Sequence, residues 1–165
     1  MRCAAAEPLL RSACRTSRLG GVALASERLA WECERIVTES ERIEQGKAIR
    51  REVLGAAHVD RPGPTPTKLQ AAFRDFTIEH CWANVWVRPG LSRRDRSVLN
   101  LGMLAAMARW HEFEVHVRGA INNGLTDDEF VEIILQVGVY AGVPVAAEAF
   151  RVADKVLAEH GRGQA

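Results

Sequence analysis

The sequence predicts an all-α protein that forms a single domain, a bundle of about six helices. Apolar residues recur at helical spacing through most of the chain after Glu41. Segments with this spacing begin at Ser or Thr and end at Gly, Pro or Asn, which are the usual helix boundaries. No strand-like alternation competes with them. The 165 residues, of which 47% are hydrophobic, are enough for one domain with its own core.

The first 36 residues differ from the rest of the chain. They contain arginine but no lysine, and they show no apolar periodicity before their last third. Four arginines against the single acid Glu7 in residues 1–26 are typical of a transit-peptide-like leader. We favour another interpretation, in which residues 1–36 are a disordered extension or a mis-assigned start, because a helical sequence begins naturally at Val37. The folded domain is then expected over residues 37–165.

Composition excludes several classes of partner. A net charge of +1 gives no argument for a nucleic-acid partner, since binding to phosphate surfaces usually shows as a clear basic excess. The longest uncharged stretch, Ile133 to Ala147, is shorter than the ~18–20 residues of a membrane span and contains Pro144. Four cysteines without any CxxC indicate a reducing compartment, so we expect a cytoplasmic protein. Its partner is expected to be a small molecule or another copy of the chain.

Two helices are expected in the first half of the domain. Residues 41–55 form a helix that Gly55 ends, and residues 56–67 form a connector whose prolines exclude regular structure. The second helix begins near residues 65–67 and continues to Trp86, and residues 88–90 (Arg-Pro-Gly) end it.

A third helix is capped by Ser92 and extends over residues 93–109. From Val98 to Ala108 it is apolar on nearly all sides, which places it in the middle of the structure. The sequence HEFEVHVRGAINNG, residues 111–124, follows either as a continuation or as a fourth helix, and its last three residues end it.

A capping box of Thr126 and Glu129 starts the fifth helix, which Gly142 ends. Pro144 suits the first turn of the last helix, which ends at Gly161. The fifth helix has more apolar surface than one neighbour can cover, so we expect a homo-oligomer. Its apolar residues are Val131, Ile133, Ile134, Leu135, Val137, Val139 and Tyr140.

The sequence HEFEVH differs by one residue from the HExxH spacing of zinc proteases. On a helix His111 and His116 are separated by ~140°, so they cannot share one metal ion. Glu112 and His116 are four residues apart, and Arg109 precedes Glu112 by three, so all three can share one face. A carboxylate beside an imidazole raises the pKa of the imidazole and orients its ring, as proton transfer requires. A solvated ion pair is the alternative interpretation.

Four segments between about Gly46 and Glu159 resemble the gamma-carboxymuconolactone decarboxylase family. They are REVLGAAHVDR, WANVWVRPGLSRRDRSVLNLGMLAAMAR, HVRGAINNGLTDDEFVEIILQ and YAGVPVAAEAF. The resemblance implies an orthogonal all-α bundle of the alkylhydroperoxidase D-like superfamily, assembled as a trimer or hexamer. It also implies decarboxylation of a lactone, with neither cofactor nor metal, in the protocatechuate branch of aromatic catabolism, the beta-ketoadipate pathway.

The peroxidase branch of that superfamily has a CxxC motif before its histidine. Here Arg109 and Glu112 occupy the two cysteine positions, so the resemblance is to the decarboxylase branch. Departures occur at Ala83, Ala141 and His111, where the family usually has Gly, Cys and an acid. These departures affect the expected substrate more than the expected fold.

The resemblance implies a role for each candidate residue. His116 is the proton donor and Glu112 orients it. Arg96 and Arg109 are the candidates for binding the acetate arm or the lactone oxygen. Trp82 and Trp86 would form the apolar wall of the pocket, although two tryptophans at this spacing are also typical of a plain core.

Three further points stay open at the level of sequence. His58 and Asp60 match the family and could form either a turn-stabilising pair or part of the site. Arg88 lies beside a helix-breaking Pro-Gly and could simply face solvent. A related lactone isomerase or hydrolase, or a non-catalytic oligomer that binds an aromatic acid, would suit the same fold.

Overall fold

A computed structural model of the chain describes residues 37–163, and these form helices without any strand. The all-α prediction is therefore confirmed, whereas the predicted extension over residues 1–36 lies outside the described residues. The helices are α3 (Glu39–Leu54), α4 (Ala56–Val59), α5 (Lys68–Thr77), the π-helix η1 (Ile78–Trp86), α6 (Arg93–Ala106), α7 (Trp110–Asn122), α8 (Asp127–Ala141) and α9 (Val143–Glu159).

Hydroxyl side chains start four of these helices. Thr38, Thr67, Ser92 and Thr126 each accept a hydrogen bond from the backbone N–H three residues on, at the N-termini of α3, α5, α6 and α8. These bonds satisfy donors that a helix N-terminus would otherwise leave without partners. The predicted caps at Ser92 and Thr126 are confirmed, and α3 begins two residues before the predicted Glu41.

Two elements differ from the prediction in the first half of the domain. The connector expected to lack regular structure contains the single turn α4, because Gly55 takes φ 84° and lets the chain turn into it. The predicted second helix is α5 followed by η1, whose hydrogen bonds span five residues instead of four. Segments of this kind are frequent at functional sites.

The predicted third and fourth helices are separate. α6 ends at Ala106, three residues before the expected end, and Ala108 takes the left-handed φ of 53°. The chain then turns so that α7 begins at Trp110. HEFEVH therefore opens a helix of its own and does not continue α6.

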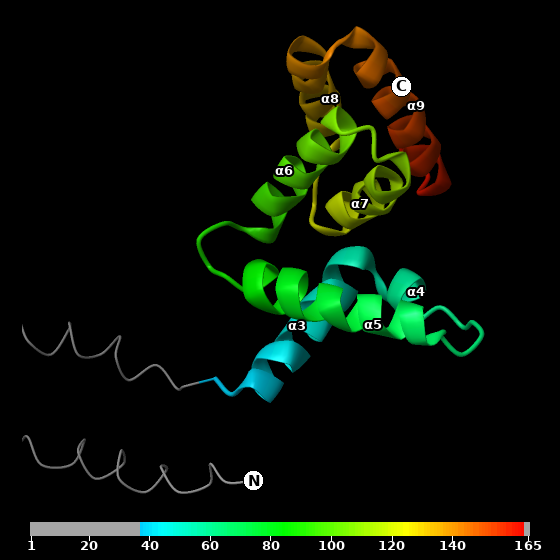
Figure 1. Ribbon diagram of the computed structural model, residues 1–165. Helices are drawn as coiled ribbons and strands as arrows, with labels where there is room; N and C mark the ends of the chain where they lie inside the picture. The colour runs from blue at the N-terminus through cyan, green and yellow to red at the C-terminus, as the bar shows by residue number, and fades with distance from the viewer. Residues whose placement is uncertain (1–36, 164–165) are drawn as a thin grey trace, which may run out of the picture. The chain divides into compact units, whose positions relative to one another are not determined.

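The described residues form two apolar cores, and α7 packs on both of them. α6, α7, α8 and α9 surround the larger core, while α3 and η1 form the smaller one (Figure 1). Val117 is buried in the larger core, and Val115 packs against the smaller core. The intervening residue, His116, therefore lies where the two cores meet. The smaller core consists of Val53, Leu54, Trp82 and Trp86.

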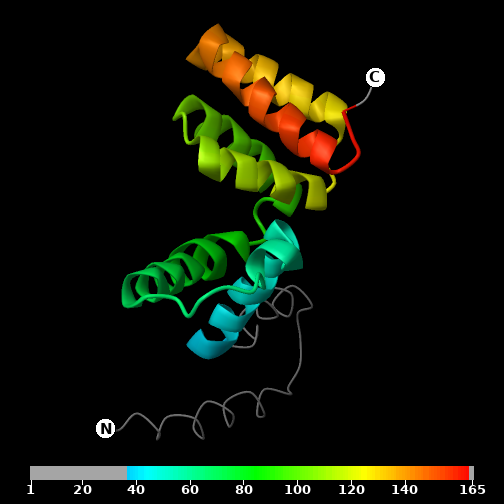
Figure 2. The ribbon, with the colours of Figure 1, turned by 90° about the vertical axis from the view of Figure 1, so that its right-hand side faces the viewer.

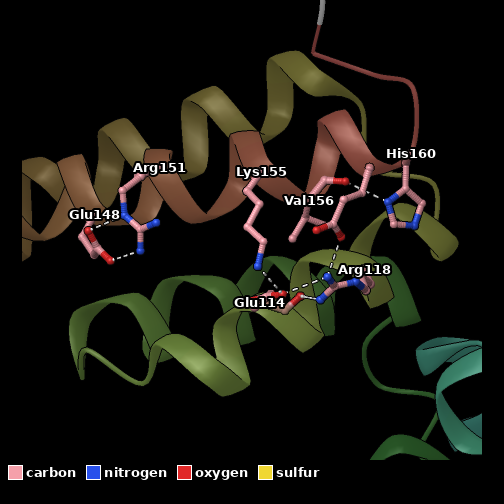
Figure 3. Close-up of polar contacts among 8 residues, drawn as sticks. Glu114, Arg118, Glu148, Arg151, Lys155, Val156 and His160 are labelled. Atoms are coloured by element: carbon pink, nitrogen blue, oxygen red, sulfur yellow. Dashed lines mark hydrogen bonds and ion pairs between the residues drawn. The ribbon is translucent and has the colours of Figure 1, made fainter. Parts of the chain in front are cut away.

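Helices α8 and α9 run side by side as a hairpin (Figure 2). Ion pairs also link α9 to α7: Arg118 Nη2 lies 2.8 Å from Glu114 Oε1 and 2.6 Å from Glu159 Oε2, and Lys155 Nζ lies 3.3 Å from Glu114 Oε1 (Figure 3). These contacts hold one side of α7 on α9. No helix among residues 37–163 is long and apolar enough to span a membrane.

Candidate active site

The imidazole of His116 lies at the end of a stack of aromatic rings. Its centroid is 6.5 Å from that of Trp86, with 19° between the planes. Trp86 in turn stacks on Trp82 at 4.9 Å and 28°. Both tryptophans are buried, as plain core residues would be, yet Trp86 also faces the histidine. The π-helix η1 thus supplies an apolar wall beside the predicted proton donor.

Two buried polar atoms of the predicted site residues lack a hydrogen-bond partner in the described structure. They are Nδ1 of His116 and Nε of Arg96. Among residues 37–163 only Asp127 Oδ1 shares this property, and that atom lies 2.7 Å from Arg162 Nη2 in an ion pair. Buried polar groups are usually satisfied, so unpartnered ones point to a ligand or to catalysis. Both residues are among those predicted from sequence.

Burial determines the charge of His116. It lowers the pKa of the imidazole below its ordinary value of 6.5, the negative charge of Glu112 raises it, and the charge of His58 lowers it again. Burial is the largest of these effects, so the net direction is downward. The predicted raising effect of Glu112 on the pKa of His116 is present, but burial outweighs it. His116 is therefore mainly neutral near neutral pH.

The lowered pKa of His116 predicts that acid destabilises the fold. The unfolded imidazole titrates near 6.5 and the folded one lower, so between these two values the unfolded chain binds more protons. The free energy of unfolding should be constant above about pH 7 and fall as the pH drops below about 6.5. His116→Gln should flatten this dependence, which urea unfolding at about pH 7.5 and about pH 5.5 would measure. An equal fall in both proteins would assign the acid sensitivity to other groups.

The two predicted arginines have different positions. Nη2 of Arg96 donates a hydrogen bond of 3.1 Å to the backbone oxygen of Arg88, so the guanidinium lies beside the end of η1, close in sequence to Trp86. Arg109 is the N-cap residue of α7, with ψ 69°, and its side chain is exposed. It therefore precedes the first helical residue of α7, and in the described structure no hydrogen bond or ion pair joins its side chain to Glu112 or His116.

Glu112 is exposed in the first turn of α7 and acts on His116 through its charge. No hydrogen bond joins the two side chains in the described structure, because His116 Nδ1 has no partner. The charge of His58, in α4, reaches the same imidazole. The structure thus brings His116, Trp86 and His58 together, with Glu112 at the margin.

The cavities found on the described residues lie away from the His116 ring. A groove of about 690 Å3 between α6 and α8 has mostly apolar walls, and none of the six predicted site residues lines it. His116 is partly buried and lines neither this groove nor the three pockets of about 340–380 Å3 that lie elsewhere on the described residues. Within residues 37–163 no three His, Cys, Asp or Glu side chains are grouped to hold a metal ion.

Comparisons with known proteins find one matching family and two relatives. The model of the carboxymuconolactone decarboxylase family matches residues 71–155, a range that contains all six predicted site residues. The chain is 37% identical over 125 residues to 4-carboxymuconolactone decarboxylase of Acinetobacter baylyi, which covers 76% of this chain and 93% of the relative. It is 38% identical over 114 residues to nitrosuccinic acid decarboxylase of Metarhizium robertsii, which covers 69% and 80% respectively.

Proposed function

Because this chain belongs to the carboxymuconolactone decarboxylase family, we propose that it is a carboxy-lyase that releases CO2 from gamma-carboxymuconolactone or a close analogue. The product is the enol-lactone of beta-ketoadipate, an intermediate of protocatechuate catabolism, and no cofactor takes part. The observation that carries this proposal is the buried, unpartnered Nδ1 of His116 beside the stacked tryptophans, and Nε of Arg96 is unpartnered as well.

The chemistry needs one proton donor and one stabiliser of negative charge. When the bond to the carboxylate breaks, CO2 leaves and the electron pair spreads through the conjugated ring onto the lactone carbonyl. A proton delivered to a ring carbon then completes the reaction. The substrate is its own electron sink, so the protein has to supply only the proton and an oxyanion partner.

His116 acts as the proton donor in this mechanism. Its imidazole is mainly neutral in the free protein, because burial lowers its pKa. An anionic substrate that binds beside the ring favours the protonated form, so the pKa of His116 rises on binding and the ring takes up the proton that it later delivers. Arg96 stabilises the developing oxyanion through its unpartnered Nε.

Nitrosuccinic acid is a second candidate substrate, because a relative of equal similarity is named for it. Its decarboxylation would follow the same steps. The nitro group accepts the electron pair that CO2 leaves behind, and the carbon that carried the carboxylate is then protonated. Both candidates also retain a second carboxylate after the reaction. The same donor and the same wall would therefore serve either acid.

The direct test is to incubate the purified protein with each acid and to measure CO2 together with the organic product. We expect CO2 release from the carboxylated lactone, with formation of the enol-lactone. Release from nitrosuccinate alone would change the substrate and keep the reaction class. A ring-opened or isomerised lactone without CO2 would contradict the proposal and support a hydrolase or isomerase.

We also propose that the protein is a homo-oligomer in which the groove between α6 and α8 is covered by a second copy. Large apolar side chains along these helices are exposed in the single chain: Leu99, Met103, Leu135, Val139 and Tyr140. Such a surface is usually an interface. Sedimentation velocity should give a multiple of the 18.2 kDa chain mass, and a monomer would contradict this proposal.

A further inference from the structure

A second pocket, of about 380 Å3, lies where α3, α4, α5 and η1 meet. Val59 and Ile78 form apolar parts of its wall. Its charged residues are mostly cationic, and they do not include any of the six residues predicted as catalytic or substrate-binding. They are Lys47, Arg50, Arg51 and Arg74, with the acids Asp60 and Asp75.

The two acids of this pocket are already paired. Asp60 Oδ2 lies 2.7 Å from Arg51 Nε, and Asp75 Oδ1 lies 3.3 Å from Arg74 Nε. Arg50, in contrast, forms no ion pair or hydrogen bond with any residue of the described range. Among the acids of residues 37–163, Arg50 therefore has no counter-ion.

Arg50 is partly buried, so its unpaired positive charge has lost part of its hydration. Its side chain is half-buried, whereas Lys47 is exposed and pairs with Glu44 at 2.7 Å. Burial lowers the pKa of Arg50, and the charge of Arg74 lowers it further. A guanidinium stays charged in proteins, so a partly desolvated one without an acid favours binding of an anion. A carboxylate fits best, because its two oxygens match the fork of the guanidinium.

The pocket adjoins the candidate active site through α4. Val59 lines the pocket and also packs on the core that contains Trp82 and Trp86. His58, the preceding residue, is close enough to Arg50 for the arginine to lower its pKa, and close enough to His116 to lower that of the second histidine. His58 therefore lies within electrostatic reach of both Arg50 and the His116 ring.

We propose that Arg50 binds a substrate carboxylate, and specifically the one that stays on the product. The identity of the substrate rests on the proposed function, but the anion site rests on the unpaired guanidinium in its pocket. A cation on the departing carboxylate would stabilise the ground state and slow the reaction. A cation on the carboxylate that stays on the product does not oppose the loss of CO2. Both candidate acids have such a carboxylate.

Steady-state kinetics of Arg50→Gln test this role. The variant keeps most of the aliphatic stem and removes the charge, so we expect KM to rise about ten- to a hundredfold with a much smaller change in kcat. Arg50→Lys keeps the positive charge but loses the forked geometry of the guanidinium. Its KM should therefore lie between that of the wild type and that of Arg50→Gln. Arg151→Gln is the matched control: it removes an exposed arginine of α9, which pairs with Glu148 (Figure 3), and should leave KM within about twofold.

Calorimetric titration with adipate separates this inference from the proposed function. Adipate has two carboxylates but no lactone, so it cannot be decarboxylated by the same route. We expect adipate to bind the wild type and Arg151→Gln alike, and to bind Arg50→Gln about tenfold more weakly. Equal affinity for wild type and Arg50→Gln, or no binding to the wild type, would overturn the inference even if CO2 is released from the lactone. If the protein releases CO2 from neither the carboxylated lactone nor nitrosuccinate, the proposed function fails. The adipate titration still decides whether Arg50 binds a carboxylate.

Discussion

His116→Ala is expected to lower kcat for the carboxylated lactone by about a hundredfold or more, which is the usual contribution of a positioned general acid. The ring is the only described group that combines a titratable nitrogen, an unpartnered buried atom and a stacked aromatic wall. The expected loss lies in kcat, because the proton is delivered after the substrate has bound. The far-UV circular dichroism spectrum should stay helical, since the residue is only partly buried.

His111→Ala is the matched control for this experiment. It removes an imidazole from the same helix, but one that is exposed in the first turn and points away from His116. Its turnover should remain near that of the wild type. His116→Gln preserves more of the side-chain volume beside Trp86, so a loss shared by both His116 variants would reflect proton transfer rather than packing. Near-normal turnover in the two variants would remove His116 from the mechanism.

The parts of this fold that could be predicted from sequence are those with a local cause. Ser92 and Thr126 cap helices through bonds to N–H groups three residues away, and Gly55 and Gly142 end helices because glycine takes a positive φ. The cause and its effect lie within one turn of chain in each case. Helix boundaries of this kind therefore appeared close to their predicted positions.

The features that escaped prediction depend on tertiary contacts. Ala108 takes a left-handed φ that alanine disfavours, and no glycine or proline marks this break between α6 and α7. The π-helical segment from Ile78 likewise has no sequence signature. The chain tolerates both because packing of the flanking helices outweighs a local cost of a few kcal/mol at most.

The same distinction applies to the site. The spacing of Glu112 and His116 gave the correct sign for the effect of the carboxylate on the imidazole, but spacing carries no information about burial, which is the larger effect. Sequence does not distinguish Arg50 from Arg51, although of the two only Arg51 forms an ion pair with an acid among residues 37–163. Such differences follow from which side chains the fold places together.

Gly46→Val is expected to lower the free energy of unfolding by about 3 kcal/mol or more, because it overfills the contact between α3 and η1. A Cβ at Gly46 would lie 2.7 Å from the backbone nitrogen of Ala83 and 2.8 Å from its Cα and Cβ. Two of these three are backbone atoms of η1, and Ala83 is buried, so the two helices would have to separate. Separation would expose Trp82 and Trp86, and their fluorescence emission should shift to longer wavelength. Urea unfolding and fluorescence spectra measure both effects.

Gly102→Ala provides the control that isolates this contact. Gly102 lies within α6, and a Cβ there would meet no atom within 4 Å, so alanine should stabilise the helix by about 0.5–1 kcal/mol. Gly46→Ala would gain the same helix propensity, but its Cβ would clash with Ala83. Such overpacking typically costs about 1–3 kcal/mol, so the net effect on stability should be destabilising. Since Gly102 lines the groove between α6 and α8, sedimentation of the same samples would detect any change in self-association. If both alanine variants were stabilised alike, α3 would not be packed against η1 as closely as the structure has it, and the wall of tryptophans beside His116 would need another support.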